Sequence, residues 1–163
     1  MIPIVSVVGK SNSGKTTLIE KMIEKLVERG YRVATIKHNL HGFDIDHEGK
    51  DSWRYKKAGA RLTLLASPGK VAVIEDTGVD LGIGELRDRY IKNVDIILTE
   101  GFKGNPYPKI EVFRSVMKRE LLSSEDDNLI AIASDVPLET DANLFDINDI
   151  EGITDMVEDL FLS

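Results

Sequence analysis

The chain of 163 residues contains no cysteine and no apolar run long enough to span a membrane. The absence of cysteine excludes disulfides, thiolate zinc sites and a thiol nucleophile. Because the sequence shows neither a membrane-spanning run nor a basic leader ahead of its first apolar segment, we expect a cytoplasmic protein without a membrane partner. The 28 acidic residues outnumber the 21 lysines and arginines, so the formal net charge is −7, which argues against a nucleic-acid-binding face. A hydrophobic content of 42% and a charged content of 30% are typical of an ordinary globular protein.

The most informative segment that is present is the glycine-rich run at residues 8–17, which reads Val-Gly-Lys-Ser-Asn-Ser-Gly-Lys-Thr-Thr. It fits the pattern G-x-x-x-x-G-K-[ST] of a phosphate-binding loop. The apolar, β-branched run at 2–8 precedes it and predicts a buried strand. Apolar residues at helical spacing follow it until Gly30 and predict a helix. Strand, loop and helix in this order are the context that the motif requires.

The residue types of this loop suit a nucleotide phosphate. Glycines allow the backbone to approach the ligand closely, and Lys15 is expected to reach the β- and γ-phosphates. Lys15 is also a catalytic candidate, because its charge would stabilise the charge on the γ-phosphate during hydrolysis. The hydroxyl of Thr16 is a predicted Mg²⁺ ligand. The loop N–H groups are expected to wrap the phosphates at the positive end of the following helix. The predicted nucleotide-binding residues are Gly9, Lys10, Ser11, Asn12, Ser13, Gly14, Lys15, Thr16 and Thr17.

The rest of the chain alternates between predicted strands and helices. Apolar runs predict strands at 31–37, 62–66, 71–75, 94–99, 109–113 and 129–133, and helical patterns occur at 51–59, 83–91 and 153–161. In the 51–59 helix, Trp53 and Ala58 are the candidate inward residues. A turn at 67–70 predicts an antiparallel hairpin at about 62–75. The fold class is therefore α/β, a P-loop NTPase-like three-layer sandwich with a mostly parallel sheet, helices on both faces and one nucleotide-binding domain over 1–163.

A P-loop protein needs an acid at the end of a neighbouring strand to hold or orient the ligands of Mg²⁺. The apolar run that ends at Glu100 makes this residue the favoured metal and catalytic candidate, with a solvated loop acid as the alternative. Asp95 begins the same strand and should lie roughly 15 Å away at the far end of the sheet. Asp76 follows another apolar run and is a weaker candidate.

All three histidines fall in the polar segment 38–52, together with four acids. Because the segment follows a strand, it is expected at the same edge of the sheet as the phosphate loop. One interpretation makes Asp46 or Asp51 an outer ligand of Mg²⁺, with Lys50 and Arg54 facing anionic groups. A second interpretation makes the histidines a transition-metal site. The third is an ordinary polar surface loop.

Recognition of the base is weakly encoded, because the Asn-Lys-x-Asp element that reads guanine in many GTPases is absent. Asp135 follows the predicted strand at 129–133, and a carboxylate there can accept two N–H donors of guanine. The alternative for Asp135 is a helix cap or a turn. Lys103 lies in a proline-stiffened loop after Glu100 and is a candidate contact to a phosphate or a partner, or an exposed lysine.

Several short motifs occur together in the order and approximate spacing of one family. They are Thr35–His38, His41, Asp46, Gly49–Ser52, Arg54, Ala58–Ala60, Thr99–Lys103 and Pro108–Val112. In these motifs the chain resembles the bacterial and archaeal molybdopterin-guanine dinucleotide biosynthesis protein B (MobB) family. The likeness runs from the phosphate loop to about Phe113 and continues faintly to Asp135.

The resemblance implies a GTP-binding adapter, at most a slow Mg²⁺-dependent GTPase, that forms a homodimer. It would work beside molybdopterin guanylyltransferase, the enzyme that attaches GMP to molybdopterin, with molybdopterin itself as a further candidate ligand. GTP and Mg²⁺ would be held through Gly14, Lys15 and Thr16, in a site lined by Asp46, Asp51 and Glu100. Lys10 departs from the family pattern, and it either reaches across a dimer interface or is solvated.

Two other functions are compatible with the same phosphate loop. A small-molecule kinase would need an acceptor pocket, for which the 38–52 segment is the candidate, and a closing lid. A nucleotide-gated metallochaperone would use the three histidines as its metal ligands.

Overall fold

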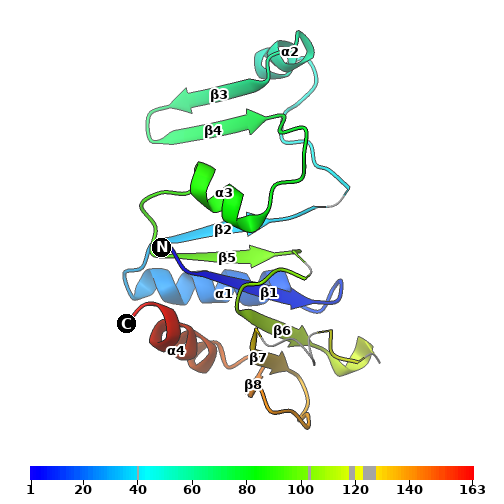
Figure 1. The fold of residues 1–163 in the computed structure, drawn as a ribbon, viewed down its shortest axis with the longest axis vertical. Coiled ribbons are helices and arrows are strands. Elements are labelled where there is room, and N and C mark those ends of the chain that lie inside the picture. Colours follow the sequence, from blue (N-terminus) through cyan, green and yellow to red (C-terminus); the bar gives the residue numbers. More distant parts are fainter. Residues whose placement is uncertain (40, 103, 118–119, 123–127) are drawn as a thin grey trace. The chain divides into compact units, whose positions relative to one another are not determined.

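The structure is a computed structural model, and it describes residues 1–39, 41–102, 104–117, 120–122 and 128–163. Figure 1 shows the elements along the chain. In order they are β1 (Ile4–Gly9), α1 (Lys15–Glu28), β2 (Val33–Lys37), α2 (Asp51–Lys57), β3 (Leu62–Ser67), β4 (Lys70–Glu75), α3 (Ile83–Tyr90), β5 (Ile96–Glu100), β6 (Lys109–Phe113), a 3₁₀ turn (Ser115–Met117), β7 (Leu129–Ser134), β8 (Asn143–Asp146) and α4 (Ile150–Phe161).

The chain divides into two compact units, of which the first comprises residues 1–38 and 86–163. Its six strands form one parallel sheet in the order β2-β5-β1-β6-β7-β8 (Figure 1). The central strands β1 and β5 read as nearly continuous apolar runs, which is typical of parallel strands that are covered on both faces. Because the strands are parallel, their carboxyl ends meet at one edge of the sheet, where the loop after β1 begins.

One face of this sheet packs against α1 and α4. The helices contribute apolar side chains at helical spacing, and Met22, Leu26, Ile153 and Val157 have no exposed surface. Alternate residues of the strands meet them, among them Val5, Val7, Leu98, Ile110 and Val112. Burial of each side chain of this size stabilises the fold by roughly 1.5–3 kcal/mol, so the two helices are held firmly to the sheet.

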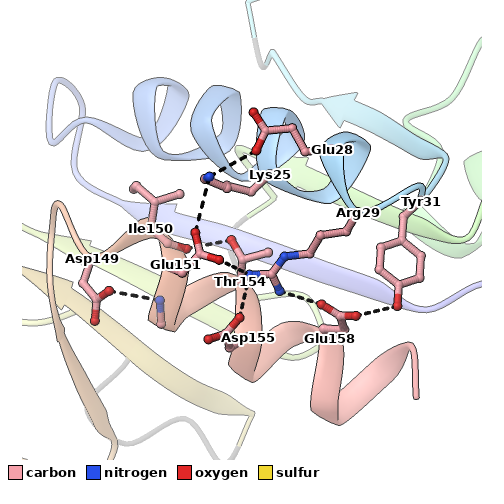
Figure 2. Close-up of polar contacts among 11 residues, drawn as sticks. Lys25, Glu28, Arg29, Tyr31, Asp149, Ile150, Glu151, Thr154, Asp155 and Glu158 are labelled. Carbon is pink, nitrogen blue, oxygen red and sulfur yellow. Dashed lines mark hydrogen bonds and ion pairs between the residues drawn. The ribbon is translucent and has the colours of Figure 1, made fainter.

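An ion-pair network adds polar contacts between the same two helices (Figure 2). Arg29, just after α1, donates 2.6 Å hydrogen bonds to both Glu151 and Asp155 of α4 and also pairs with Glu158. The hydroxyl of Tyr31 donates to Glu158 at 2.7 Å. The hydrogen bonds from Arg29 and from Lys25 lower the pKa of Glu151, and those from Tyr31 and Arg29 lower the pKa of Glu158. The ionised carboxylates of Glu151 and Glu158 therefore help to hold α4 against the end of α1.

The opposite face of the sheet buries polar side chains. Ser6, Thr99, Lys109 and Glu111 are each at most 2% exposed. The hydroxyls of Ser6 and Thr99 hydrogen bond to each other at 2.9 Å, and the ammonium of Lys109 donates to the carbonyl oxygens of the preceding loop at 105 and 107. Burial of these groups is tolerated because each one is hydrogen bonded.

The second unit comprises residues 39–85. Strands β3 and β4 pair as an antiparallel hairpin from Leu62↔Glu75 to Ser67↔Lys70, and α2 contacts β3. One face of the hairpin carries four large apolar side chains that are 45–61% exposed, namely Leu62, Leu64, Val71 and Val73. A hairpin of two strands with one uncovered apolar face is at best marginally stable by itself.

The predicted fold class is confirmed in its mostly parallel sheet, its helices and the hairpin at about 62–75. The extent of a single nucleotide-binding domain over 1–163 stays a prediction. Among the described residues no helix is both long enough and apolar enough to cross a membrane.

Two details of the sequence analysis were wrong, and one short strand was missed. β2 begins at Val33 rather than Tyr31, because Tyr31 instead turns its hydroxyl to Glu158. β8 was not predicted, since it is an edge strand of four residues whose side chains are at most partly buried. In α2 the buried residue is Ser52, whose hydroxyl donates to Asp46 at 2.9 Å, while Trp53 is partly buried and Ala58 is exposed.

Candidate nucleotide-binding site

The loop between β1 and α1 has a backbone that only glycine permits at its first position. Gly9 has a φ of 143°, and a Cβ there would lie 2.6 Å from the carbonyl oxygen of Val112 and 2.8 Å from the hydroxyl of Ser13. The loop then turns back on itself, since the N–H of Ser13 donates to the carbonyl of Lys10 at 3.3 Å. The first glycine of the motif is therefore required by the packing of the loop against β6.

The loop leads into an amino-terminal helix end that favours an anion. Gly14 precedes the first turn of α1, which contains no acid, and no side chain of the described residues caps this end. The first N–H groups of a helix lack partners within the helix, and they carry the positive end of its dipole. The hydroxyl of Ser13 is buried and has no hydrogen-bond partner among the described residues. These unsatisfied donors suit phosphate oxygens.

The lysine of the motif lies over the same loop. The ammonium of Lys15 donates to the carbonyl oxygen of Lys10 at 2.8 Å. This contact curls the side chain back along the loop, where its charge adds to the positive field of the helix end. Ser11, Asn12 and the flanking Thr17 are exposed.

Glu100 meets the first turn of α1, as the sequence predicts for the acid of a P-loop site. The hydroxyl of Thr16 donates to Glu100 Oε2 at 3.1 Å, and the side chain of Glu100 is only 16% exposed. A hydroxyl oxygen and a carboxylate oxygen side by side are hard ligands of the kind that Mg²⁺ prefers. The oxygen ligands that Thr16 and Glu100 offer therefore fit this ion.

Lys37 belongs to the Thr35–His38 motif, but the sequence analysis gave it no role of its own at this site. Its ammonium lies 3.6 Å from Glu100 Oε2, the oxygen that also accepts from Thr16. Lys37 ends β2, and it is the register partner of Glu100 on β5. An exposed lysine at the end of a strand has no distinctive sequence signal. Only its place beside Glu100 in the parallel register could have found it.

The backbone after Glu100 is tightly held. The N–H of His38 donates to the carbonyl of Glu100 at 2.8 Å, and the rings of His38 and Phe102 stack with centroids 4.4 Å apart. Gly101 has a φ of 98°, and a Cβ there would lie 2.5 Å from the carbonyl oxygen of His38. Asn105 accepts from the hydroxyl of Ser6 and donates to the carbonyl of Phe102 at 2.7 Å. These contacts fix the direction from which the carboxylate of Glu100 enters the site.

Four of the predicted site residues belong to the second unit. Asp46 accepts 2.9 Å hydrogen bonds from Ser52 and from the N–H of His47 through Oδ1, and its Oδ2 is buried without a partner among the described residues. Lys50 and Asp51 lie at the start of α2, and Arg54 follows on an exposed position of the same helix. The roles of Asp46 and Asp51 as metal ligands, and of Lys50 and Arg54 as anion contacts, stay predictions.

The interpretation of the histidines as metal ligands finds no support. Within the described part of the chain, no three His, Cys, Asp or Glu side chains are grouped so that they could hold a metal ion. His38 is instead stacked on Phe102. Lys103, the other polar candidate of this region, lies outside the described residues.

Asp135 follows β7 and is partly engaged by the chain itself. Its Oδ1 accepts from the backbone N–H of Ser115 at 2.8 Å, and Arg114 lies 3.8 Å from its Oδ2. The backbone hydrogen bond from Ser115 is the main reason that the pKa of Asp135 is lowered. The carboxylate is therefore an ionised acceptor near neutral pH. Its recognition of guanine stays a prediction.

The parallel sheet, the glycine loop with its helix, and the acid from the neighbouring strand define a protein of P-loop NTPase-like fold. A family model described as molybdopterin guanine dinucleotide synthesis protein B (MobB) matches residues 4–135. The chain therefore belongs to the MobB family, as its motifs indicated.

Relatives and solved structures agree with this assignment. The molybdopterin-guanine dinucleotide biosynthesis adapter protein of Haemophilus influenzae is 41% identical over 96% of this chain and 88% of its own length. The protein of the same name from Escherichia coli is 42% identical over 96% of this chain and 92% of its own. The crystal structure of Bacillus subtilis MobB is 32% identical, with a TM-score of 0.76 and 98% of each chain covered.

Proposed function

We propose that the chain is a GTP-binding adapter that assists the formation of molybdopterin guanine dinucleotide. The observation that carries this proposal is the hydrogen bond between Thr16 and Glu100 at the mouth of the glycine loop. It joins the two residues that a P-loop site needs for a metal-bound nucleotide. The adapter role is supported by the names of two relatives that are 41% and 42% identical to this chain over the aligned residues.

In this proposal the loop N–H groups and Lys15 bind the β- and γ-phosphates of GTP. Thr16 and Glu100 hold Mg²⁺, which would supply charge neutralisation on the same phosphates. Hydrolysis is expected to be slow, because Glu100 lies against Thr16 and would be engaged with the metal ion rather than free to take a proton from water. A turnover number of many per second for the isolated protein would contradict this part of the proposal.

The proposal includes a cytoplasmic homodimer that meets the enzyme attaching GMP to molybdopterin. The hairpin face formed by Leu62, Leu64, Val71 and Val73 supports self-association, because such a face is exposed in the single chain. Apolar patches of this kind commonly mark protein contacts. With a net charge of −7, two copies would repel each other, so an apolar contact is the better route to a dimer. Lys10 could then reach across the interface or remain solvated.

Equilibrium binding of GTP, ATP and molybdopterin to the wild type and to Lys15→Ala tests the proposal. We expect GTP to bind in preference to ATP, and the substitution to weaken GTP binding by at least about tenfold, because a charge-assisted hydrogen bond to phosphate is lost. Lys21→Met, on the exposed side of α1, is the matched control and should bind like the wild type. Preference for ATP would contradict the guanine assignment, and transfer of phosphate to a small acceptor would indicate a kinase.

A further inference from the structure

We propose that the ammonium of Lys37 pairs with the carboxylate of Glu100 when no divalent metal ion is bound, and that Mg²⁺ displaces it when the metal ion and nucleotide bind. The inference rests on the proposed function, because it concerns the metal end of the same site. It assigns a positioning role to a residue that lies outside the P-loop motif.

The register of the parallel sheet brings the two residues together. Lys37 and Glu100 are partners on the neighbouring strands β2 and β5, at the carboxyl edge of the sheet. The ammonium lies 3.6 Å from Glu100 Oε2, and Thr16 donates to the same oxygen at 3.1 Å. One carboxylate oxygen thus faces both the predicted metal ligand of the motif and a positive charge.

The difference in exposure gives the two partners different roles. The side chain of Glu100 is 16% exposed and that of Lys37 is 68% exposed. A largely buried carboxylate is costly without a compensating charge, and it would repel the phosphates of a nucleotide beside it. A lysine at the rim can supply that charge, since its ammonium is a point charge on a long, flexible stem.

The contact is also loose enough to be exchanged. A separation of 3.6 Å is longer than an N–H···O hydrogen bond, so the two groups attract each other mainly through space. The ammonium of Lys37 stays in contact with water, since its side chain is 68% exposed, so it loses little when it leaves the carboxylate. Its release therefore costs little when a divalent ion, with twice the charge, takes the same oxygen.

This arrangement predicts opposite effects of removing the charge with and without metal. In Lys37→Met, metal-free GTP should bind more weakly than to the wild type, because the carboxylate faces the phosphates without a counter-charge. Mg²⁺ should bind more tightly, because its competitor is gone. We expect the ratio of the GTP dissociation constant in EDTA to that in Mg²⁺ to rise at least about fivefold, as the loss of one charge within several ångströms requires.

The experiment measures this ratio with a fluorescent GTP analogue for the wild type, Lys37→Met, Lys37→Arg and Lys21→Met. Lys37→Arg keeps the charge and should return the ratio toward the wild-type value, while Lys21→Met removes a charge elsewhere on the same unit and should leave it unchanged. Mn²⁺ binding to the nucleotide-free protein, followed by electron paramagnetic resonance, gives a second readout. The affinity for Mn²⁺ should rise in Lys37→Met and should stay at the wild-type value in Lys37→Arg and Lys21→Met.

The same substitution in a Glu100→Gln background separates two mechanisms. If Lys37 acts through Glu100, Lys37→Met should no longer change the ratio once the carboxylate charge has been removed. A loss of GTP affinity that is equal with and without metal, and that persists in this background, would show that Lys37 contacts phosphate directly and would overturn the inference. Equal ratios in Lys37→Met and Lys21→Met would also overturn it. Failure of the wild type to bind GTP under either condition would instead overturn the proposed function.

Discussion

The two compact units of the chain differ in how far their apolar side chains are buried. In the first unit Val5, Leu98 and Ile110 have no exposed surface, and two helices cover the sheet. Of the sixteen large hydrophobic side chains that are exposed in the described part of the chain, nine lie at 39–85, which is less than a third of its length. The first unit completes its own core and can hold a rigid phosphate site. The second leaves large apolar side chains exposed, as in the hairpin face proposed above for self-association.

The largest expected effect is the loss of a core side chain from the first unit. Leu26 is fully buried between α1 and the sheet, and Leu26→Ala should lower the free energy of unfolding by about 2–5 kcal/mol, since it leaves a cavity. Urea denaturation followed by circular dichroism measures the change. Val27→Ala, one position along and 55% exposed, is the control and should change stability by less than about 0.5 kcal/mol. Similar losses in both variants would mean that α1 does not pack as described.

The second-largest expected effect is a loss of self-association when the apolar face of the hairpin receives a charge. Leu64 is 56% exposed and pairs with Val73 on the apolar face. Leu64→Asp should leave the unfolding of the single chain nearly unchanged but weaken self-association by about 30-fold or more, because a charge at the centre of an apolar contact is costly. Light scattering during size-exclusion chromatography measures the mass.

Two outcomes of the Leu64→Asp experiment would change the comparison. A monomeric wild type would refute the proposed homodimer and would leave the partner enzyme as the occupant of the hairpin face. A dimer that persists in Leu64→Asp and dissociates in Val27→Asp would place self-association on α1 of the first unit instead.

The third prediction concerns the rigidity of the phosphate site. Gly101→Ala should destabilise the first unit by about 1–3 kcal/mol, because an alanine there must adopt a positive φ and would also approach the carbonyl of His38. Gly104→Ala is the matched control, since Gly104 has a φ of 68° but no atom within 4 Å of the added Cβ. A larger loss for Gly101→Ala than for Gly104→Ala isolates the close approach to His38. Equal losses would mean that backbone strain alone explains both.

Much of the site was predictable because its signals are contiguous. The strand, the glycine loop and the helix follow one another directly, and Glu100 closes an apolar run whose direction is fixed by the parallel sheet. A short stretch of sequence was therefore enough to predict roles for Lys15 and Thr16, and a second short stretch was enough for Glu100. The hairpin was found in the same way, from two apolar runs and one turn.

The parts that were missed depend on contacts between distant segments. Nothing local in the sequence shows that Lys37 lies beside Glu100, because the pair exists only through the register of β2 and β5. The burial of Lys109 likewise depends on carbonyl oxygens of the preceding loop, and the engagement of Asp135 depends on the N–H of Ser115. Pattern analysis weighs residue types along the chain, and it does not count hydrogen-bond partners that the fold supplies.

The smallest expected effect is a change in the pH dependence of the melting temperature, caused by carboxylates of the first unit. The pKa values of Glu151 and Glu158 are lowered in the folded chain, where Arg29 donates to both carboxylates. A carboxylate whose pKa is lower in the folded state stabilises the fold above its unfolded pKa, and this contribution is lost as the pH falls through the folded value. Arg29→Met should therefore have a lower melting temperature than the wild type at pH 7, and this difference should shrink below about pH 4.5.

Arg32→Met offers a control in the same unit with a different acid window. Arg32 holds Asp95 through its backbone and side chain, which lowers the pKa of Asp95 to about 2. The difference in melting temperature between Arg32→Met and the wild type should thus persist at pH 3. At that pH the difference between Arg29→Met and the wild type should already be smaller than at pH 7. Melting curves at pH 7, 5, 4 and 3 decide the matter. If both differences narrow together, a general loss of carboxylate charge is responsible, and the α1–α4 network has no separate part in the acid stability of the first unit.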